Sequence, residues 1–178
     1  TDMSAMFASI GYKKMETLNL GDKFNTSKVT KMAYMFTNCG YTALGSLDLG
    51  ADFDTSSVTD MQYMFNATGH NSMTSLNLRD KFNTSNVTNM ACMFMNTGHD
   101  KMQSLDLKDK FYTAKVTNME EMFYGTGATS MTVLDLGTGF TKIAATNTDM
   151  FKGCGNTNLV VYAPELIYSS ESAFKLGK

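Results

Sequence analysis

The two histidines of the sequence are the residues most readily assigned to chemistry. His70 and His99 lie 29 residues apart, and Asn71 and Asp100 follow them directly. An imidazole can act as a general base or as a metal ligand. However, neither histidine has a Ser or Cys nucleophile at a fixed, unrepeated place, and active sites are rarely duplicated along a repeat. We therefore expect both histidines to stack in loops, with no catalytic residues, no cofactor and no metal.

A second candidate is a column of Asn and Asp residues, each placed between two leucines of a repeat. The column consists of Asn19, Asp48, Asn77, Asp106 and Asp135. These side chains can hydrogen-bond a ligand or hold a cation, although carboxylates of neighbouring repeats alone do not supply the six or more oxygens that Ca²⁺ prefers. The alternatives are a solvated polar ladder and a contact surface for a protein or glycan. A glycosidase would also need aromatic sugar platforms, which are not evident beside the carboxylates.

Two positively charged residues break the repeat just after this column. Arg79 and Lys108 stand where Gly21, Gly50 and Gly137 stand in other copies. A contact surface has to be distinctive somewhere, and an arginine at its middle is well placed to anchor a partner. The candidate ligand-binding residues are therefore Asn19, Asp48, Asn77, Arg79, Asp106, Lys108 and Asp135.

The spacing of these residues follows a period of 29 residues, shortened to 28 at the last step. A Met-Phe pair begins at Met6, Met35, Met64, Met93, Met122 and Met150. A Leu-Asn/Asp-Leu triplet begins at Leu18, Leu47, Leu76, Leu105 and Leu134. A fixed period in this range is typical of a solenoid, in which each copy buries its apolar face against its neighbours. The chain opens in mid-repeat, so we interpret residues 1–158 as a fragment of a repeat solenoid and residues 159–178 as a C-terminal cap.

Each repeat contains signals for one strand and one helix. Alternation in Leu47-Asp48-Leu49 predicts a short strand with both leucines on one face. Farther along the repeat, the spacing of a short helix with one buried stripe is found at Val58, Met61, Met64 and Phe65.

Capping signals predict where these helices begin and end. Thr59 and Gln62 form the T-x-x-Q pattern of a capping box. Helix starts are therefore predicted at Thr30, Thr59, Thr88 and Thr117. A glycine follows each Met-Phe pair, which suits a left-handed C-terminal cap. The predicted fold class is an α/β solenoid: a leucine-rich-repeat-like, right-handed stack of about six 29-residue units, each with a short parallel strand and a short helix.

The repeated columns also identify the core. Of the 16 Met residues, 15 fall in three columns, which favours a packed interior over a Met-rich binding groove. Cys39 and Cys154 share a column but lie four copies apart, about 19 Å at ~4.8 Å per strand, so no disulfide is expected. A further column consists of Thr26, Thr55, Thr84 and Thr113. It resembles the hydroxyl array of ice-binding solenoids, but turns and helix caps explain it more simply.

The overall composition argues against two kinds of partner. The net charge of -2 and the pI near 5.6 do not suit a nucleic-acid-binding protein, which needs clustered Lys and Arg. No apolar run approaches the ~20 residues of a membrane helix. We therefore expect a monomer with no nucleic-acid partner and no membrane insertion by this segment.

The repeat motif is clearest in F-D-T-S-S-V-T-D-M (residues 53–61) and F-N-T-S-N-V-T-N-M (residues 82–90). It resembles the BspA-like, leucine-rich-repeat-related surface proteins, a repeat family long known as a domain of unknown function in mycoplasma lipoproteins and Gram-positive surface proteins. The resemblance implies a bacterial, extracellular protein, at the cell surface or secreted, with no assigned catalytic residues. We therefore expect a non-enzymatic module for adhesion that binds a host or cell-surface protein or glycan through its polar strand face. The alternative is a structural spacer or stalk that presents another domain at the cell surface.

Overall fold

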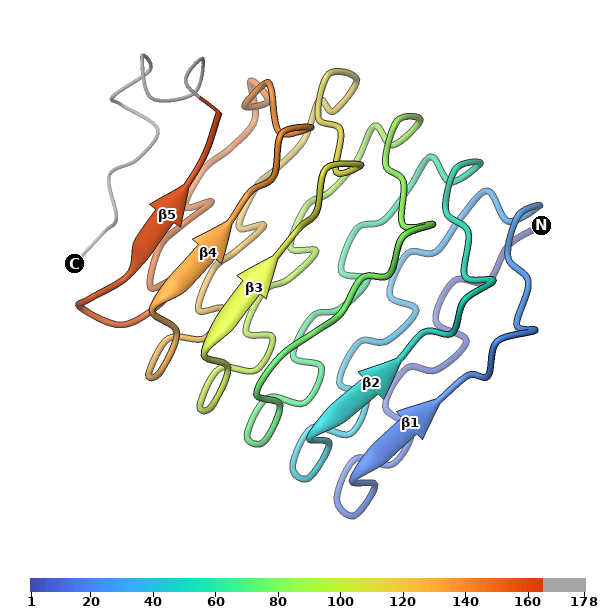
Figure 1. The fold of residues 1–178 in the computed structure, drawn as a ribbon, viewed down its shortest axis with the longest axis horizontal. Helices are drawn as coiled ribbons and strands as arrows, with labels where there is room; N and C mark the ends of the chain where they lie inside the picture. The colour runs from blue at the N-terminus through green and yellow to red at the C-terminus, as the bar shows by residue number, and fades with distance from the viewer. Residues whose placement is uncertain (165–178) are drawn as a thin grey trace.

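The chain winds into a stack of similar coils, and the computed structural model describes residues 1–164 (Figure 1). Successive coils follow one another in chain order from the N-terminal end of the stack. Neighbouring coils pair in parallel at the 29-residue step: Leu18 lies opposite Leu47, and Leu105 lies opposite Leu134. The predicted period and the predicted parallel direction of the strands are therefore confirmed.

One side of the stack is formed by strands of three residues. They are β1 (Thr17–Asn19), β2 (Ser46–Asp48), β3 (Ser104–Asp106), β4 (Val133–Asp135) and β5 (Val160–Tyr162). β1 and β2 form one sheet, and β3, β4 and β5 form a second sheet in that order. Asn77 connects the sheets because it bridges Asp48 on one side and Asp106 on the other. We call this the strand-side ladder; it narrows to a single bridged residue in the copy that contains Asn77.

A second ladder joins the coils away from the strands, and we call it the turn-side ladder. It is marked by parallel bridges at Asp2, Lys31, Asp60, Asn89, Asn118 and Thr146. At one step of this ladder, four N–H groups donate to carbonyls of the next coil at 2.7–3.0 Å: those of Met61, Tyr63, Phe65 and Ala67. The equivalent four hydrogen bonds form at each of the other steps, so this side of the stack is regular throughout the described chain.

This pairing takes the place of the predicted helices. No helix occurs within residues 1–164, so the prediction of an α/β solenoid with a helix in each unit is wrong. The segment is instead a run of overlapping β-turns. Met64 donates its N–H to the carbonyl of Met61 at 3.1 Å, and the third residue of that turn, Tyr63, has a φ of 56°. The next such turn ends at Thr68 and has Ala67 in the same place, with a φ of 52°.

The reason lies in the direction of the backbone N–H groups. A helix satisfies its interior N–H groups within its own segment, whereas here every second N–H pairs with the next coil. Consecutive β-turns also bring the chain back to the same side about every three residues, so they produce a spacing of buried side chains that resembles that of a helix. The predicted burial is confirmed even though the conformation is not, since the fully buried residues include Val58, Met61, Met64 and Phe65.

The predicted capping box is wrong for the same reason. Thr59 Oγ1 donates to the carbonyl of Thr30, one coil away, at 3.2 Å. Gly69 does adopt the predicted left-handed conformation, with a φ of 52°, but it follows a run of turns rather than a helix. A Cβ at this position would lie 2.6 Å from a neighbouring side-chain carbon, which explains why a glycine stands there.

The interior is filled by the predicted Met and Phe columns. Phe rings stack from coil to coil, with centroids 5.5 Å apart for Phe36 and Phe65 and 6.4 Å apart for Phe82 and Phe111. The first coil is less covered, and Met6 is 50% exposed. Cys39, Cys92 and Cys154 are free and buried, in agreement with the expectation that no disulfide forms.

Threonine hydroxyls connect the coils from within. The buried column consists of Thr26, Thr55, Thr84 and Thr113, and Thr55 Oγ1 donates to the carbonyl of Asn83 at 2.9 Å. A second buried column does the same, with Thr97 Oγ1 donating to the carbonyl of Phe65 at 2.7 Å. Since the first of these columns is buried, it does not offer the exposed hydroxyl array that ice binding requires.

β5 is the last element that the structure describes. It pairs with β4 in parallel, so the strand-side ladder continues into the cap predicted for residues 159–178. The rest of that predicted cap, from residue 165 onward, lies outside the described residues. Within residues 1–164 there is no helix of the length and apolarity needed to cross a membrane.

Candidate functional site

The predicted Asn/Asp column lies along the strand-side ladder, where each side chain accepts a hydrogen bond from its own backbone. Asp48 Oδ1 accepts from the N–H of Gly50 at 2.9 Å, and Asn77 Oδ1 accepts from the N–H of Arg79 at 2.9 Å. The same bond to the residue two positions later is made by Asn19, Asp106 and Asp135. One oxygen of every residue in the column therefore holds the turn that follows the strand.

This structural role was not expected from the sequence, although the motif contains a signal for it. The residue that donates the N–H is a glycine in three copies, with φ values of 76°, 78° and 68° at Gly21, Gly50 and Gly137. An Asn or Asp followed two residues later by glycine is a typical turn sequence. The column is thus in part a folding device, and only the remaining side-chain atoms are available to a ligand.

Arg79 and Lys108 occupy this glycine position and keep its left-handed backbone. Their φ values are 61° and 64°. A residue with a Cβ costs roughly 1–2 kcal/mol in this region, a cost that glycine does not incur. Both side chains then turn towards carboxylates of the polar column, but in two different ways.

Arg79 pairs with the preceding coil. Its Nη2 lies 2.6 Å and its Nε 3.1 Å from Asp48 Oδ1, and the two side chains are 41% and 35% exposed. The hydrogen bond from the N–H of Gly50, followed by that from Arg79, lowers the pKa of Asp48. The carboxylate in turn raises the pKa of Arg79. The guanidinium is therefore held in place and still half-exposed.

Lys108 pairs within its own coil. Its Nζ lies 2.5 Å from Asp106 Oδ2. Burial alone would raise the pKa of Asp106, but the hydrogen bonds from the ammonium and the N–H of Lys108 outweigh it and leave that pKa lowered. The hydrogen bond to Asp106 raises the pKa of Lys108.

A hollow of about 700 Å³ opens beside these two pairs, and we call it the strand-side hollow. It brings together four of the seven predicted ligand-binding residues, namely Arg79, Asp106, Lys108 and Asp135. Further charges are added by Asp80, Asp109 and Lys110, and a ring by Tyr162. The other three predicted residues, Asn19, Asp48 and Asn77, belong to the same column but do not line the hollow.

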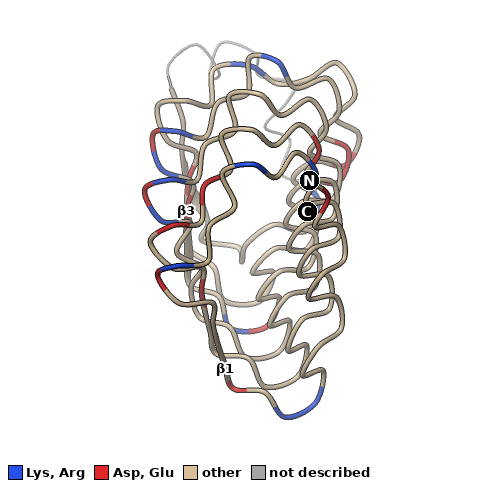
Figure 2. Cartoon of the chain, turned by 90° about the vertical axis from the view of Figure 1, so that its right-hand side faces the viewer, with Lys and Arg blue, Asp and Glu red and all other residues tan. Residues whose placement is uncertain are grey.

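Charges of both signs alternate along the loops next to the strands (Figure 2). Some of these charges already have partners in the preceding coil: Lys81 Nζ forms an ion pair with Asp52 Oδ1 at 2.6 Å, and Lys110 Nζ donates to the backbone carbonyl of Asp80 at 3.0 Å. This face is therefore a mixed-charge surface rather than a basic or acidic patch.

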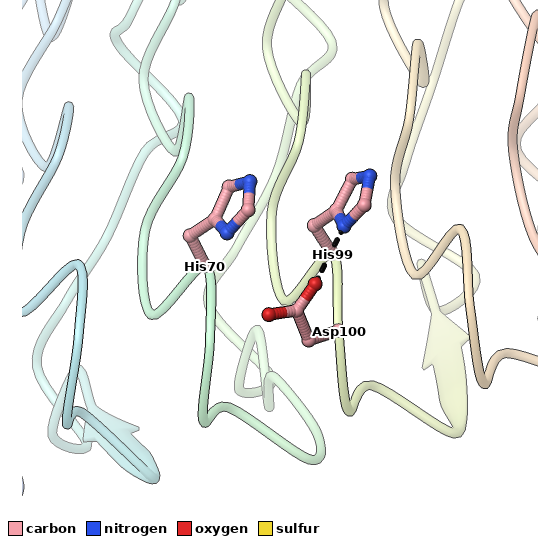
Figure 3. Close-up of side chains that lie close together, drawn as sticks. All are labelled: His70, His99 and Asp100. Atoms are coloured by element: carbon pink, nitrogen blue, oxygen red, sulfur yellow. Dashed lines mark hydrogen bonds and ion pairs between the residues drawn. The ribbon is translucent and has the colours of Figure 1, made fainter.

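The two histidines lie one above the other, as the sequence predicts. The ring centroids of His70 and His99 are 4.7 Å apart, and the ring planes differ by 5° (Figure 3). They continue a stack that begins with Tyr12 and Tyr41 in the preceding coils.

A stack of strand-and-turn coils with a polar, partly hollowed strand side defines a repeat protein built from one unit. The chain belongs to the family described as "Mycoplasma protein of unknown function, DUF285", whose model matches residues 1–133 and again residues 46–162. The family name indicates a bacterial protein. Comparison with curated proteins gave no match. Comparison with solved structures gave no match either.

Proposed function

We propose that the chain is a non-enzymatic extracellular binding module that engages a protein or glycan of a host or cell surface through the strand-side hollow. The observation that carries this proposal is the break in the repeat at Arg79 and Lys108. Both residues line the hollow, and both stand where equivalent coils have glycine. The resemblance to BspA-like surface proteins supports the same location and the same kind of partner.

The energetics of these two positions favour a role in binding over a role in folding. A left-handed residue other than glycine costs roughly 1–2 kcal/mol. An exposed ion pair adds little to stability, and Arg79–Asp48 and Lys108–Asp106 are both half-exposed. Folding alone therefore gives little reason to replace the glycine twice in neighbouring coils. Strain kept without a gain in stability is typical of functional positions.

The hollow suits a ligand that carries hydrogen-bonding groups and both signs of charge. Arg79 uses its Nε and Nη2 on Asp48, so the remaining guanidinium N–H groups can donate to a carboxylate or carbonyl of a partner. Asp80, Asp109 and Asp135 line the same hollow and can accept from a partner's amines or hydroxyls. A surface of this size supports a weak contact, which many copies at a cell surface would strengthen through avidity.

The test compares Arg79→Gly/Lys108→Gly with wild type for binding to a panel of host matrix proteins and glycans. Both substitutions introduce the residue of the sister coils at positive φ, so the variant should fold and melt at or slightly above the wild-type temperature. The matched control is Lys13→Thr/Lys14→Ala, which also removes two positive charges and introduces the residues found at Thr42 and Ala43.

We expect the glycine variant to lose binding and the control variant to keep it. Equal binding by wild type and the glycine variant would show that the hollow is not the site. If wild type binds nothing on a broad panel, the structural spacer becomes the better proposal. The spacer is supported by the turn-side ladder, whose four hydrogen bonds repeat at every step and would give a regular rod.

A further inference from the structure

Four ring side chains stack along one column of loop positions, and the last two of them are imidazoles. The ring centroids are 4.9 Å apart for Tyr12 and Tyr41, 4.5 Å for Tyr41 and His70, and 4.7 Å for His70 and His99. The next coil has Ala128 in this column, so its side chain adds no ring. Stacking by itself does not require a histidine, because the two tyrosines stack equally well.

The change from tyrosine to histidine brings metal-binding atoms together. His70, His99 and Asp100 each offer one ligand atom, and these three atoms lie within 4.8 Å of one another. Figure 3 shows the two rings side by side with the Asp100 carboxylate beneath them. All three residues are half-buried, so the cluster is supported by the protein and still open to solvent.

The backbone holds this cluster in register. The N–H of Asp100 donates to the carbonyl of His70 at 3.0 Å, which ties the carboxylate of one coil to the histidine of the coil before it. The preceding glycine of the same loop is fixed as well, since the N–H of Gly98 donates to the carbonyl of Thr68 at 3.1 Å. The three ligands therefore sit on hydrogen-bonded backbone rather than on a free loop.

The three ligand atoms lie within 4.8 Å of one another, so side-chain rotation has to bring them to the spacing of ligands on one ion. His99 Nδ1 lies 2.8 Å from Asp100 Oδ1. Two ligands on one tetrahedral zinc, with bonds of about 2.0–2.1 Å, lie roughly 3.3 Å apart. An ion can take the place of the proton that these two atoms share. His70 Nδ1 is 2.6 Å from Asn71 Oδ1 and would exchange that hydrogen bond for the ion by a tilt of its half-exposed ring.

We propose that His70, His99 and Asp100 form a binding site for a divalent transition metal ion of the Zn²⁺ type. Two imidazoles and one carboxylate suit Zn²⁺, Ni²⁺ and Cu²⁺, whereas Mg²⁺ and Ca²⁺ prefer a shell of oxygens. A fourth position remains open to water or to a ligand atom from a partner. This proposal differs from the expectation from sequence that no metal binds here; it rests on the carboxylate of Asp100, which the fold brings close to both rings.

The test is calorimetric titration of ZnCl₂ into protein that carries no added histidines and has been freed of metal with a chelator. We expect one ion per chain in wild type and no binding of MgCl₂. The informative variants are His70→Tyr, His99→Tyr and Asp100→Asn. His70→Tyr and Asp100→Asn introduce the residues of the preceding coil, Tyr41 and Asn71, and His99→Tyr introduces the tyrosine found earlier in the same column. The two tyrosine variants keep a ring in the stack and remove only the ligand nitrogen.

We expect each of these variants to bind Zn²⁺ at least about 10- to 100-fold more weakly than wild type. The matched control is Tyr41→Phe, which keeps the ring against His70 and should leave Zn²⁺ affinity unchanged. The proposal is overturned if wild type takes up no Zn²⁺, or if His70→Tyr and His99→Tyr bind as tightly as wild type. The second outcome would place the ion elsewhere.

Discussion

The two ladders that hold the coils together differ in their tolerance of sequence change. The turn-side ladder forms four backbone hydrogen bonds at every step. The strand-side ladder consists of three-residue strands and narrows to a bridge at Asn77. One ladder is uniform along the described chain, and the other is interrupted near its middle.

One position of the turn-side ladder accepts side chains of many kinds. At the third residue of the equivalent β-turns, the φ value is positive for Ala5, Tyr34, Tyr63, Cys92, Glu121 and Asp149. These residues differ in size and charge, yet the same four hydrogen bonds form at each step. The strand side instead relies on an Asn or Asp and, in three copies, on a glycine two residues later. The copy with Arg79 has no regular strand, whereas the copy with Lys108 keeps β3. Backbone pairing therefore maintains the turn side, while the strand side is where the repeat varies.

The largest destabilisation is expected where a substitution removes an apolar contact beneath the turn-side ladder. Met64 is fully buried, so Met64→Asp places an unpaired carboxylate in the core and should cost about 4 kcal/mol or more. The damage should spread to neighbouring coils, because each coil is stabilised by the next. The measurement is thermal or denaturant unfolding followed by circular dichroism. Met95→Asp is the control, because Met95 is half-exposed and the equivalent residues of the neighbouring coils are Asn66 and Tyr124. An unchanged melting curve for Met64→Asp would refute the burial of the Met column.

A medium effect should separate a glycine that has close neighbours from one that has none. Gly69→Ala on the turn side would bring a Cβ to 2.6 Å from Met73 Cβ and 2.8 Å from the carbonyl oxygen of Leu44. We expect a loss of roughly 1–3 kcal/mol in the free energy of unfolding. Gly21→Ala in the first coil meets nothing within 4 Å, so only the left-handed backbone, at about 1 kcal/mol, opposes it, whereas a Cβ at the equivalent Gly50 would lie 2.2 Å from the carbonyl oxygen of Gly21. Equal destabilisation by Gly69→Ala and Gly21→Ala would contradict the role assigned to these close contacts.

The smallest effect concerns how stability depends on pH through the ion pair between Arg79 and Asp48. The pKa of Asp48 is lowered from its ordinary value of 3.8, so its contribution to stability is present above 3.8 and is lost as the pH falls through the lower, folded value. Asp48→Asn keeps the hydrogen bond to Gly50, as Asn19 and Asn77 do, but removes the charge. Unfolding curves of wild type and variant should differ at neutral pH by a small amount and converge below the folded pKa. A difference that persists in strong acid would mean that the charge is not its source.

The sequence predicted the period, the parallel pairing, the buried columns and four of the residues that line the strand-side hollow, but not how the charged side chains of the hollow pair. Met64 and Phe65 are buried as expected, and Gly69 is left-handed as expected. The candidate residues of the hollow were named because Arg79 and Lys108 break the repeat. Their partners were not predictable, since Arg79 reaches Asp48 in the coil before it and Lys108 turns back to Asp106 in its own coil.

Which residues face inward was determined by the sequence itself, because a 29-residue period places equivalent side chains above one another and only the apolar columns can be buried. The conformation between the strands was decided by the tertiary structure. A buried spacing of three residues is compatible with a helix and with a run of β-turns. The turns prevail here because alternate N–H groups, such as those of Tyr63 and Phe65, find carbonyl partners 28 residues away in the next coil. No local pattern in the sequence indicates that a backbone carbonyl of the next coil accepts these hydrogen bonds, because the carbonyl comes into reach only when the coils stack.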